Sequence, residues 1–278
     1  MPSLQPVTHF VGRSSELAQL RQHLQPGQIV TLCGPGGVGK TALSRMALND
    51  PEILARFPDG MIVHPFYQEK LAEQAWGRIA RECDLDPRPN ARAAATQALA
   101  QRRCLLVLDG AEAAADLRAV IQVRGPHCGL LITSQNRSHT WHKRIDVKPL
   151  PDDEARRLLE LWADLQLEDD AAVPLQKSLG NLPLALRMVG SYLDATGMSA
   201  ADNLGMPEPE QLRSLDARPD QFPQRSLRRQ TRRRPSPSCP AWWPTKKKSA
   251  TPRPPSMPNM LPPSAASLHK DWFNLLVD

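Results

Sequence analysis

The amino-acid sequence predicts a three-layer α/β fold with a central parallel sheet, followed by a small helical subdomain and a disordered tail. Three observations support this prediction. Short apolar runs alternate with segments of helical period as far as residue 149, as in repeated strand–helix–strand units. Residues 150–198 show helical periods alone, and residues 199–278 are rich in proline and arginine. We therefore expect three regions, 1–149, 150–198 and 199–278.

A helix is expected first, within residues 14–24. Ser14 or Ser15 can serve as its N-cap, and Leu17, Leu20 and Leu24 fall on one helical face. The sequence Gln-Pro-Gly at residues 25–27 then ends the helix. A helix with one apolar face is expected to pack on a sheet.

The octet Gly-Pro-Gly-Gly-Val-Gly-Lys-Thr at residues 34–41 satisfies the pattern G-x-x-x-x-G-K-[ST]. An apolar, β-branched run at 28–33 predicts a strand before it, and helix-forming residues at 41–48 follow it. The glycines allow successive backbone N–H groups to point into one concavity at a helix N-terminus, which binds anions. The alternative is a glycine-rich turn that only connects a strand to a helix. The complete octet with both flanks argues for the P-loop NTPase fold.

A P-loop predicts a nucleoside di- or triphosphate as the ligand, together with Mg²⁺. Lys40 would reach the β- and γ-phosphates, and the hydroxyl of Thr41 would be a metal ligand. The residues expected to contact the nucleotide from this loop are Gly34, Gly36, Gly37, Val38, Gly39, Lys40 and Thr41.

Further strand and helix segments are expected between residues 61 and 102. Residues 61–66 predict a strand ended by Pro65, and residues 68–83 predict a helix with apolar positions every four residues. A proline-containing loop at 84–90 then leads to an alanine-rich helix at 91–102.

Residues 104–110 predict a buried strand that delivers Asp109 at its carboxyl end. This is the Walker B arrangement, in which the carboxylate holds the Mg²⁺ shell directly or through water. The alternative is an aspartate that only ends the strand and caps the next helix. Its position 69 residues after Lys40, with strands and helices between, favours the Mg²⁺ role. Glu112 is the nearest other carboxylate, and either it polarises the attacking water or it lies on a helix surface.

Residues 129–134 predict another buried strand, which ends in Thr133 and Ser134. The carboxyl edge of an open α/β sheet is where ligands bind, although both residues could equally cap the following turn. Residues 144–148 alternate and predict a short last strand.

Two helices are expected after residue 150. Asp152 should cap the first, whose apolar face consists of Ala155, Leu158, Leu159, Trp162 and Leu165. Residues 180–186 open the second, with Pro183 near its first turn, where proline is tolerated. This helix should run to about Leu193 and end at Gly197.

The charge of the chain is uneven. The formal net charge is +6, yet residues 221–278 hold 11 Lys and Arg against only Asp271 and Asp278. The basic character therefore belongs to the tail. The five cysteines show no spacing typical of a zinc site or a disulfide framework, and no apolar stretch is long enough to span a bilayer. We expect a reduced, cytoplasmic setting.

Taken together, these motifs resemble the NB-ARC group of signal-transduction ATPases (the STAND class), particularly its bacterial regulators. The resemblance extends from about Phe10 to Leu193, and the sequence looks like a member truncated after the Gly-x-Leu-Pro-Leu block. It rests on Phe-Val-Gly-Arg at 10–13, the P-loop, the strands ending at Asp109 and Ser134, and Gly-Asn-Leu-Pro-Leu at 180–184.

The resemblance implies roles for particular residues. Val11, Gly12 and Arg13 would line the adenine and ribose, Pro183 would pack on the nucleotide, and Thr133 would sense the phosphate end. It further implies an ADP-locked closed state that opens for assembly when ATP replaces ADP, with self-association or a regulatory protein as partner. Such a protein would be a nucleotide-dependent switch.

Two positions depart from the family pattern. Gly110 stands where many relatives carry an acidic residue, and Gln135 stands where relatives usually carry an arginine, the next one being Arg137. Both departures predict slow hydrolysis at most. The competing hypothesis of an active AAA+-like ATPase would require an adjacent catalytic acid and an arginine finger.

The tail beyond residue 221 allows three interpretations. Basic clusters at 228–229, 232–234 and 246–248 lie among proline and serine with few apolar residues, a composition typical of disorder. It could be a basic arm that binds nucleic acid, with Trp242 and Trp243 available for stacking. It could also be a solvated tail, or the product of a shifted reading frame. The abrupt change of composition favours the last two.

Overall fold

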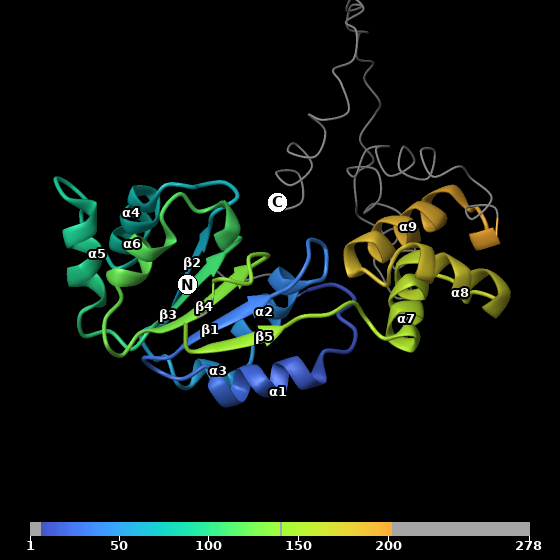
Figure 1. The fold of residues 1–278 in the computed structure, drawn as a ribbon, viewed down its shortest axis with the longest axis horizontal. Coiled ribbons are helices and arrows are strands. Elements are labelled where there is room, and N and C mark those ends of the chain that lie inside the picture. Colours follow the sequence, from blue (N-terminus) through green and yellow to red (C-terminus); the bar gives the residue numbers. More distant parts are fainter. Residues whose placement is uncertain (1–6, 140, 202–278) are drawn as a thin grey trace, which may run out of the picture. The chain divides into compact units, whose positions relative to one another are not determined.

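The computed structural model describes residues 7–139 and 141–201, and the predictions for the tail lie outside these residues (Figure 1). The core of the fold is one sheet of five parallel strands. Their order is β2-β3-β4-β1-β5. The strands are β1 (Ile29–Cys33), β2 (Met61–Pro65), β3 (Leu105–Asp109), β4 (Gly129–Ser134) and β5 (Lys143–Asp146). The predicted α/β fold with a central parallel sheet is confirmed.

The sheet order brings the predicted site residues to one edge. Strand β4 lies between β1 and β3, with Cys33 paired to Ser134 and Leu108 paired to Ile132. Because all strands are parallel, the carboxyl ends of β1, β3 and β4 point the same way. The P-loop after β1, Asp109 at the end of β3 and Thr133 near the end of β4 therefore lie at the same edge.

Helices cover both faces of the sheet, because alternate strand residues point to opposite sides. In β3, Leu106 and Leu108 pack in the core with α4 (Ala72–Glu82), α5 (Ala91–Leu99) and α6 (Leu117–Gln122). Leu105 and Val107 pack on the other face with α1 (Ser14–His23), α2 (Lys40–Leu48) and α3 (Pro51–Leu54). Figure 1 shows α4, α5 and α6 together on one side of the sheet and α1 and α3 on the other.

Three further helices follow the sheet and share a separate apolar core. They are α7 (Asp152–Ala163), α8 (Asp169–Ser178) and α9 (Pro183–Thr196). Leu159 of α7, Leu175 of α8 and Leu186 of α9 are all fully buried in this core. As predicted, Pro183 occupies the first turn of α9, and Gly197 ends it in the left-handed conformation.

Several helix ends differ from the predictions for local reasons. Helix α1 begins at Ser14 with Arg13 at the cap position, so neither serine caps it. Helix α7 is preceded by Pro151, and the carboxylate of Asp152 accepts a bond from Asn181 Nδ2 at 2.7 Å instead of capping. Leu165 lies beyond the end of α7 and is exposed, because Asp164 turns the chain into the left-handed region.

Other boundaries shifted, and some elements were not predicted. Helix α4 starts four residues later than expected, because residues 66–68 form a turn after β2 and the chain stays irregular up to residue 71. Helix α5 ends at Leu99, three residues early, and β5 is shifted by one residue toward the N-terminus at its start. The short helices α3 and α6, the 3₁₀ turn η1 (Ala111–Ala113) and the longer α8 were missed.

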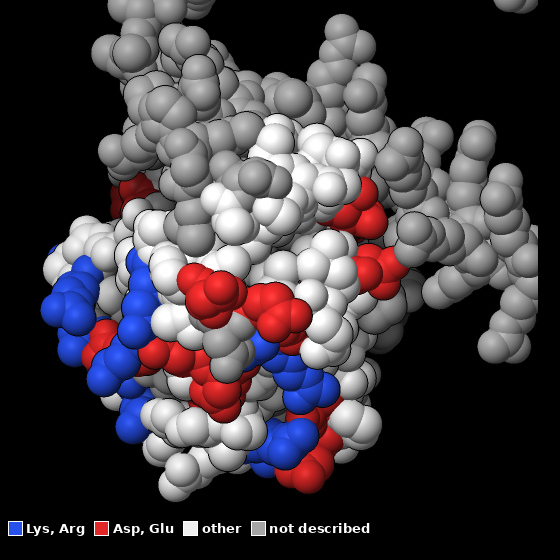
Figure 2. Space-filling model, turned by 90° about the vertical axis from the view of Figure 1, so that its right-hand side faces the viewer, with Lys and Arg blue, Asp and Glu red and all other residues white. Residues whose placement is uncertain are grey.

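Charged side chains of both signs are interspersed on the face that Figure 2 shows. This face therefore offers no continuous basic surface among the described residues. In that same part of the chain, no helix is long and apolar enough to cross a membrane. The four cysteines within it are free thiols, with Cys104 Sγ and Cys128 Sγ 3.3 Å apart.

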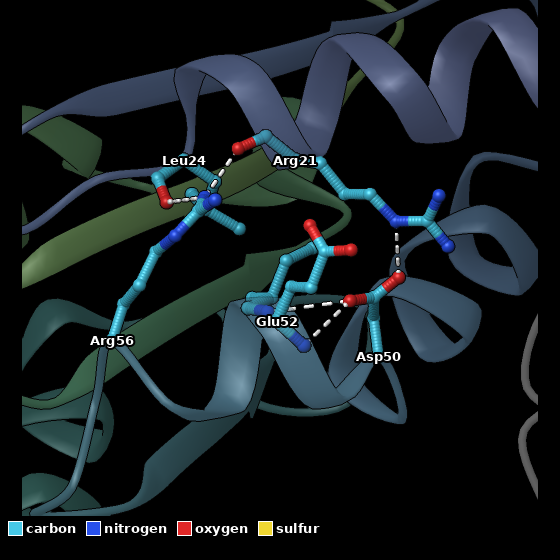
Figure 3. A network of polar contacts seen from close by, with 6 residues as sticks. Arg21, Leu24, Asp50, Glu52 and Arg56 are labelled. Atoms are coloured by element: carbon cyan, nitrogen blue, oxygen red, sulfur yellow. Dashed lines mark hydrogen bonds and ion pairs between the residues drawn. The ribbon is translucent and has the colours of Figure 1, made fainter.

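Asp50 connects α1 and α3 on the same face of the sheet (Figure 3). Its carboxylate caps α3 by accepting bonds from the N–H groups of Glu52 at 3.0 Å and Ile53 at 3.3 Å. Arg21 of α1 donates to the same carboxylate at 2.6 Å. Burial alone would raise the pKa of Asp50, but these hydrogen bonds together hold the pKa below its ordinary value.

Arg56 completes this network from the segment after α3 (Figure 3). Its guanidinium donates to the carbonyl oxygens of Arg21 and Leu24, at the C-terminal end of α1. A cation at a helix C-terminus satisfies carbonyl groups that have no partner within the helix. The network therefore fixes α1, and with it the segment before α1 that includes Arg13.

We predict that Asp50→Ala lowers the free energy of unfolding by about 2 kcal/mol, the upper end for loss of an N-cap. The carboxylate is buried, serves two backbone N–H groups and pairs with Arg21. Asp116→Ala is the matched control, since Asp116 caps α6 through one bond to the N–H of Ala119 and has no ion-pair partner in the described chain. The control should cost about 0.5–1 kcal/mol in the same chemical denaturation experiment. Equal losses would show that the network adds nothing to a simple cap.

Candidate functional site

The P-loop follows β1 and closes on the start of α2. Gly37 and Gly39 adopt φ values of +72° and +95°, and Gly39 is the N-cap residue of α2. These left-handed conformations are strained for residues with a Cβ. The sequence pattern therefore produces the expected loop, with its backbone N–H groups gathered at a helix N-terminus.

Lys40 is buried at the mouth of this loop. Its ammonium donates to the carbonyl oxygens of Gly34 at 3.0 Å and Pro35 at 2.9 Å. Burial lowers the pKa of Lys40, while the charges of Glu112 and Asp109 act in the opposite direction. Among the described residues no carboxylate forms an ion pair with Lys40. A buried cation held only by carbonyl groups is suited to receive an anion.

Asp109 is held by hydroxyl groups from two other elements. Thr41 Oγ1 donates to its carboxylate, with distances of 3.0 and 3.1 Å to the two oxygens. Thr133 Oγ1 of β4 donates to it at 2.5 Å and accepts the N–H of Gly110 at 2.8 Å. Burial raises the pKa of Asp109, and these hydrogen bonds oppose that effect.

The Asp109 and Thr41 side chains could hold Mg²⁺. Mg²⁺ commonly takes one or two protein ligands and completes its octahedron with water and phosphate oxygens. Asp109 is only 8% exposed and forms no ion pair within the described chain. A carboxylate that is buried to this extent requires a cation beside it. In that part of the chain no group of three or more His, Cys, Asp or Glu could hold a metal alone. The two residues therefore fit a metal that phosphate shares.

Glu112 lies in η1 beside this carboxylate and is engaged at both oxygens. The hydroxyl of Tyr67 donates to Oε1, and the N–H of Gln135 donates to Oε2 at 3.1 Å. Glu112 is only partly exposed and takes part in a cluster rather than simply lying on a helix surface. Its catalytic role stays a prediction.

The backbone conformation and surroundings of residue 110 explain why a glycine, and not an acidic residue, follows Asp109. It adopts φ +71°, and a Cβ at this position would overlap the ring of Tyr67. Any other side chain at position 110 would therefore need a displaced Tyr67 and a strained backbone.

The Arg13 side chain, from the segment before α1, contacts the P-loop. Its guanidinium donates to the carbonyl oxygen of Val38 at 3.0 Å and pairs with Glu16 at 2.9 Å. Gly12 and Arg13 both have positive φ values, and a Cβ on Gly12 would overlap the carboxylate of Glu154 in α7. These contacts place Arg13 against the loop, while its contact with adenine or ribose stays a prediction. Val11 packs against the core of α7, α8 and α9.

The start of α9 contacts the P-loop directly. The N–H of Leu184 donates to the carbonyl oxygen of Gly37 at 3.1 Å. Cβ atoms placed on Gly37 and Gly39 would come within 3.2 Å of Leu184 and 3.7 Å of Pro183. Pro183 therefore lies next to the predicted phosphate loop, while its packing on the nucleotide stays a prediction.

Sequence reasoning missed several members of this site, chiefly Tyr67, Gln135 as a backbone donor, and Glu154. Tyr67 follows the end of β2, at the carboxyl edge of the sheet, and only this position in the sequence indicated that it could belong to the site. Leu184 belongs to the Gly-Asn-Leu-Pro-Leu sequence at 180–184, but the bond from its N–H to Gly37 was not predicted.

The parallel sheet, the glycine loop and the carboxylate opposite it define a P-loop nucleotide-binding protein. The sequence model of the NB-ARC domain family matches residues 13–164, more than half of the chain. The chain belongs to the NB-ARC domain family.

Curated relatives come from Arabidopsis thaliana. The chain is 26% identical over 221 residues to Probable disease resistance protein At5g66900, with 72% of this chain and 26% of that protein covered. It is 27% identical over 199 residues to Probable disease resistance protein At5g66910, with 66% and 24% covered. The chain thus spans about a quarter of the length of these relatives.

Two solved structures share the fold at low sequence identity. The Walker-type ATPase PABY2304 of Pyrococcus abyssi is 17% identical, with a TM-score of 0.54 over 76% of this chain and 79% of that one. CDC6P from Pyrobaculum aerophilum is also 17% identical, with a TM-score of 0.53 over 74% and 65%. At this identity the likeness describes the fold alone.

We predict that Asp109→Asn stabilises the nucleotide-free protein at neutral pH. The pKa of Asp109 is higher in the folded than in the unfolded protein. The free energy of unfolding therefore falls as pH rises from the pKa of the unfolded state, about 4, through that of the folded state. Asparagine keeps an oxygen for Thr41 and Thr133 and carries no charge to desolvate. The melting temperature of the variant should therefore exceed that of the wild type at pH 7.5, with a smaller gap at pH 5.

Asp146→Asn is the control, because the Asp146 side chain is 38% exposed and pairs with Arg144, so removing its charge should not raise the melting temperature. An Asp109→Asn protein that melts below the wild type at pH 7.5 would show that the hydroxyl groups alone compensate the buried charge.

Proposed function

We propose that this chain is the ADP- and ATP-binding switch module of a STAND-type regulatory protein, with slow Mg²⁺-dependent ATP hydrolysis at most. One observation carries the proposal. A buried ammonium, that of Lys40, and a buried carboxylate, that of Asp109, adjoin the same glycine loop, and neither has an ion-pair partner in the described chain. A polyphosphate with its Mg²⁺ would supply both missing charges.

The contacts of α7 and α9 support the switch. The N–H of Leu184 is bonded to Gly37 of the loop, and Glu154 lies against Gly12 in the segment before α1, so the helical part touches both the loop and the N-terminal segment. A nucleotide in the loop would contact both groups of elements. Its affinity would then differ between open and closed arrangements, and this difference is what shifts a conformational equilibrium.

The groups around the expected terminal phosphate support slow chemistry. Residue 110 is a glycine and not an acid, and both oxygens of Glu112 already accept hydrogen bonds from the protein. Gln135 occupies the position where an arginine would contact the phosphate. We expect a turnover well below ~1 s⁻¹, the low end for ordinary enzymes. A faster rate would favour the AAA+-like alternative.

The wider biological role is part of the proposal. The relatives named as disease resistance proteins support a signalling role with self-association or a regulatory protein as partner; these relatives are plant proteins, so the expected likeness to bacterial regulators in particular is not supported. A cytoplasmic location is consistent with such a role and stays a prediction.

Lys40→Ala tests the nucleotide site in the full chain. We predict that ADP affinity falls about 10- to 100-fold, since charge-assisted hydrogen bonds contribute about 1.5–3 kcal/mol. Lys70→Ala is the matched control, because Lys70 is exposed and lies outside the P-loop. Titration calorimetry with ADP, and with ATP in the presence and absence of Mg²⁺, provides the measurement. An unchanged ADP affinity in Lys40→Ala would remove the proposed site.

A further inference from the structure

Tyr67 connects two loops at the edge of the candidate site. It follows β2, its ring covers Gly110 directly after β3, and its hydroxyl donates to Glu112 in η1. The same carboxylate accepts the N–H of Gln135, directly after β4. One carboxylate therefore joins the ends of three neighbouring strands.

The cluster lies next to the P-loop. A Cβ on Gly36 would be 3.6 Å from the side-chain amide of Gln135. The charge of Glu112 also acts on the ammonium of Lys40, where it opposes the fall in pKa caused by burial. Glu112 and Asp109 are thus the two carboxylates whose charges act on the ammonium expected to bind the terminal phosphate.

Hydrolysis at this place needs an acceptor for a proton. The oxygen of water bonds to the γ-phosphorus while the bond from that phosphorus to the bridging oxygen of ADP breaks, and ADP leaves with the bonding electrons. The proton of the attacking water passes to a base. Asp109 is committed to two hydroxyl groups and, by our proposal, to Mg²⁺, so Glu112 is the remaining carboxylate.

The hydrogen bonds of Glu112 determine where its oxygens can point. A general base must reach the water with a lone pair at about 2.6–3.2 Å. Here one oxygen is directed at Tyr67 and the other at the backbone of Gln135. Burial, followed by the hydrogen bond to Glu112 and the charge of that residue, raises the pKa of Tyr67, so the phenol remains a donor at neutral pH.

We propose that Tyr67 is a positioning residue that holds Glu112 away from the attacking water and thereby keeps ATP hydrolysis slow. This rests on the proposed function, since it concerns the same nucleotide site. When the bond between the Tyr67 hydroxyl and Glu112 is absent, Glu112 turns toward the water and accepts its proton.

Tyr67→Phe tests this in the full chain, because phenylalanine keeps the ring against Gly110 and removes only the hydroxyl. We predict that kcat for ATP hydrolysis rises about 10-fold, below the roughly 10²-fold that a fully positioned base contributes. KM should stay unchanged, since the hydroxyl is bonded within the protein, to Glu112 and to the side chain of Gln135. In the double variant Tyr67→Phe/Glu112→Gln the gain should disappear.

Tyr192→Phe is the matched control, because Tyr192 is the other tyrosine of the chain and lies in α9; its kcat should equal that of the wild type. ADP affinity, measured for every variant, separates the two proposals. If Tyr67→Phe binds ADP like the wild type but hydrolyses ATP no faster, the role of Tyr67 is overturned and the switch module stands. If the gain persists in the double variant, Glu112 is not the base and the role is likewise overturned. If the wild type binds no adenine nucleotide, both proposals fail.

Discussion

The rest of the site depends on one carboxylate buried among three elements. Asp109 ends β3, Thr41 begins α2 after β1, and Thr133 comes from β4, and their side chains meet within hydrogen-bond distance. They can meet only because β4 lies between β1 and β3 in a parallel sheet. The order of the strands is thus a condition for the chemistry. Burying this carboxylate costs stability, which the two hydroxyl groups partly offset and which a bound cation would offset further.

Backbone conformation sets a second constraint on the same edge. Gly110 has a positive φ and lies under the ring of Tyr67, which leaves no room for a side chain directly after Asp109. The nearest acid is therefore Glu112, one turn further on and bonded to its neighbours. If Glu112 is the base that we propose, this combination of binding groups and a restrained base would favour holding a nucleotide over hydrolysing it. Rapid turnover would require a base that is free to reach the attacking water.

The sequence predicted the parts of the molecule that local chemistry determines. The octet at 34–41 and the apolar strands ending at Asp109 and Ser134 were located correctly, because each carries its own pattern. Helix α3 was missed because Asp50 looked like part of a closing turn, although Asp before Pro is also a helix start. The pairing of Tyr67 with Glu112 could not be predicted from spacing. It depends on β2 pairing with β3, and 45 residues separate the two side chains.

The P-loop is also held from two directions by groups that are not part of it. Arg13 binds the carbonyl oxygen of Val38, and the N–H of Leu184 binds that of Gly37, so adjacent peptide units are fixed by the N-terminal segment and by α9. A phosphate binds the N–H groups of this loop, whereas Arg13 and Leu184 bond to its carbonyl groups. A nucleotide and these two contacts can therefore be present together. A movement of α9 that breaks the bond of Leu184 would free one of the two adjacent peptides while Arg13 still holds the other. In the proposed switch, a shift of the helical part would thus reach the phosphate site through the bond of Leu184, in addition to the contacts of Pro183 and Glu154, without any change in the sheet.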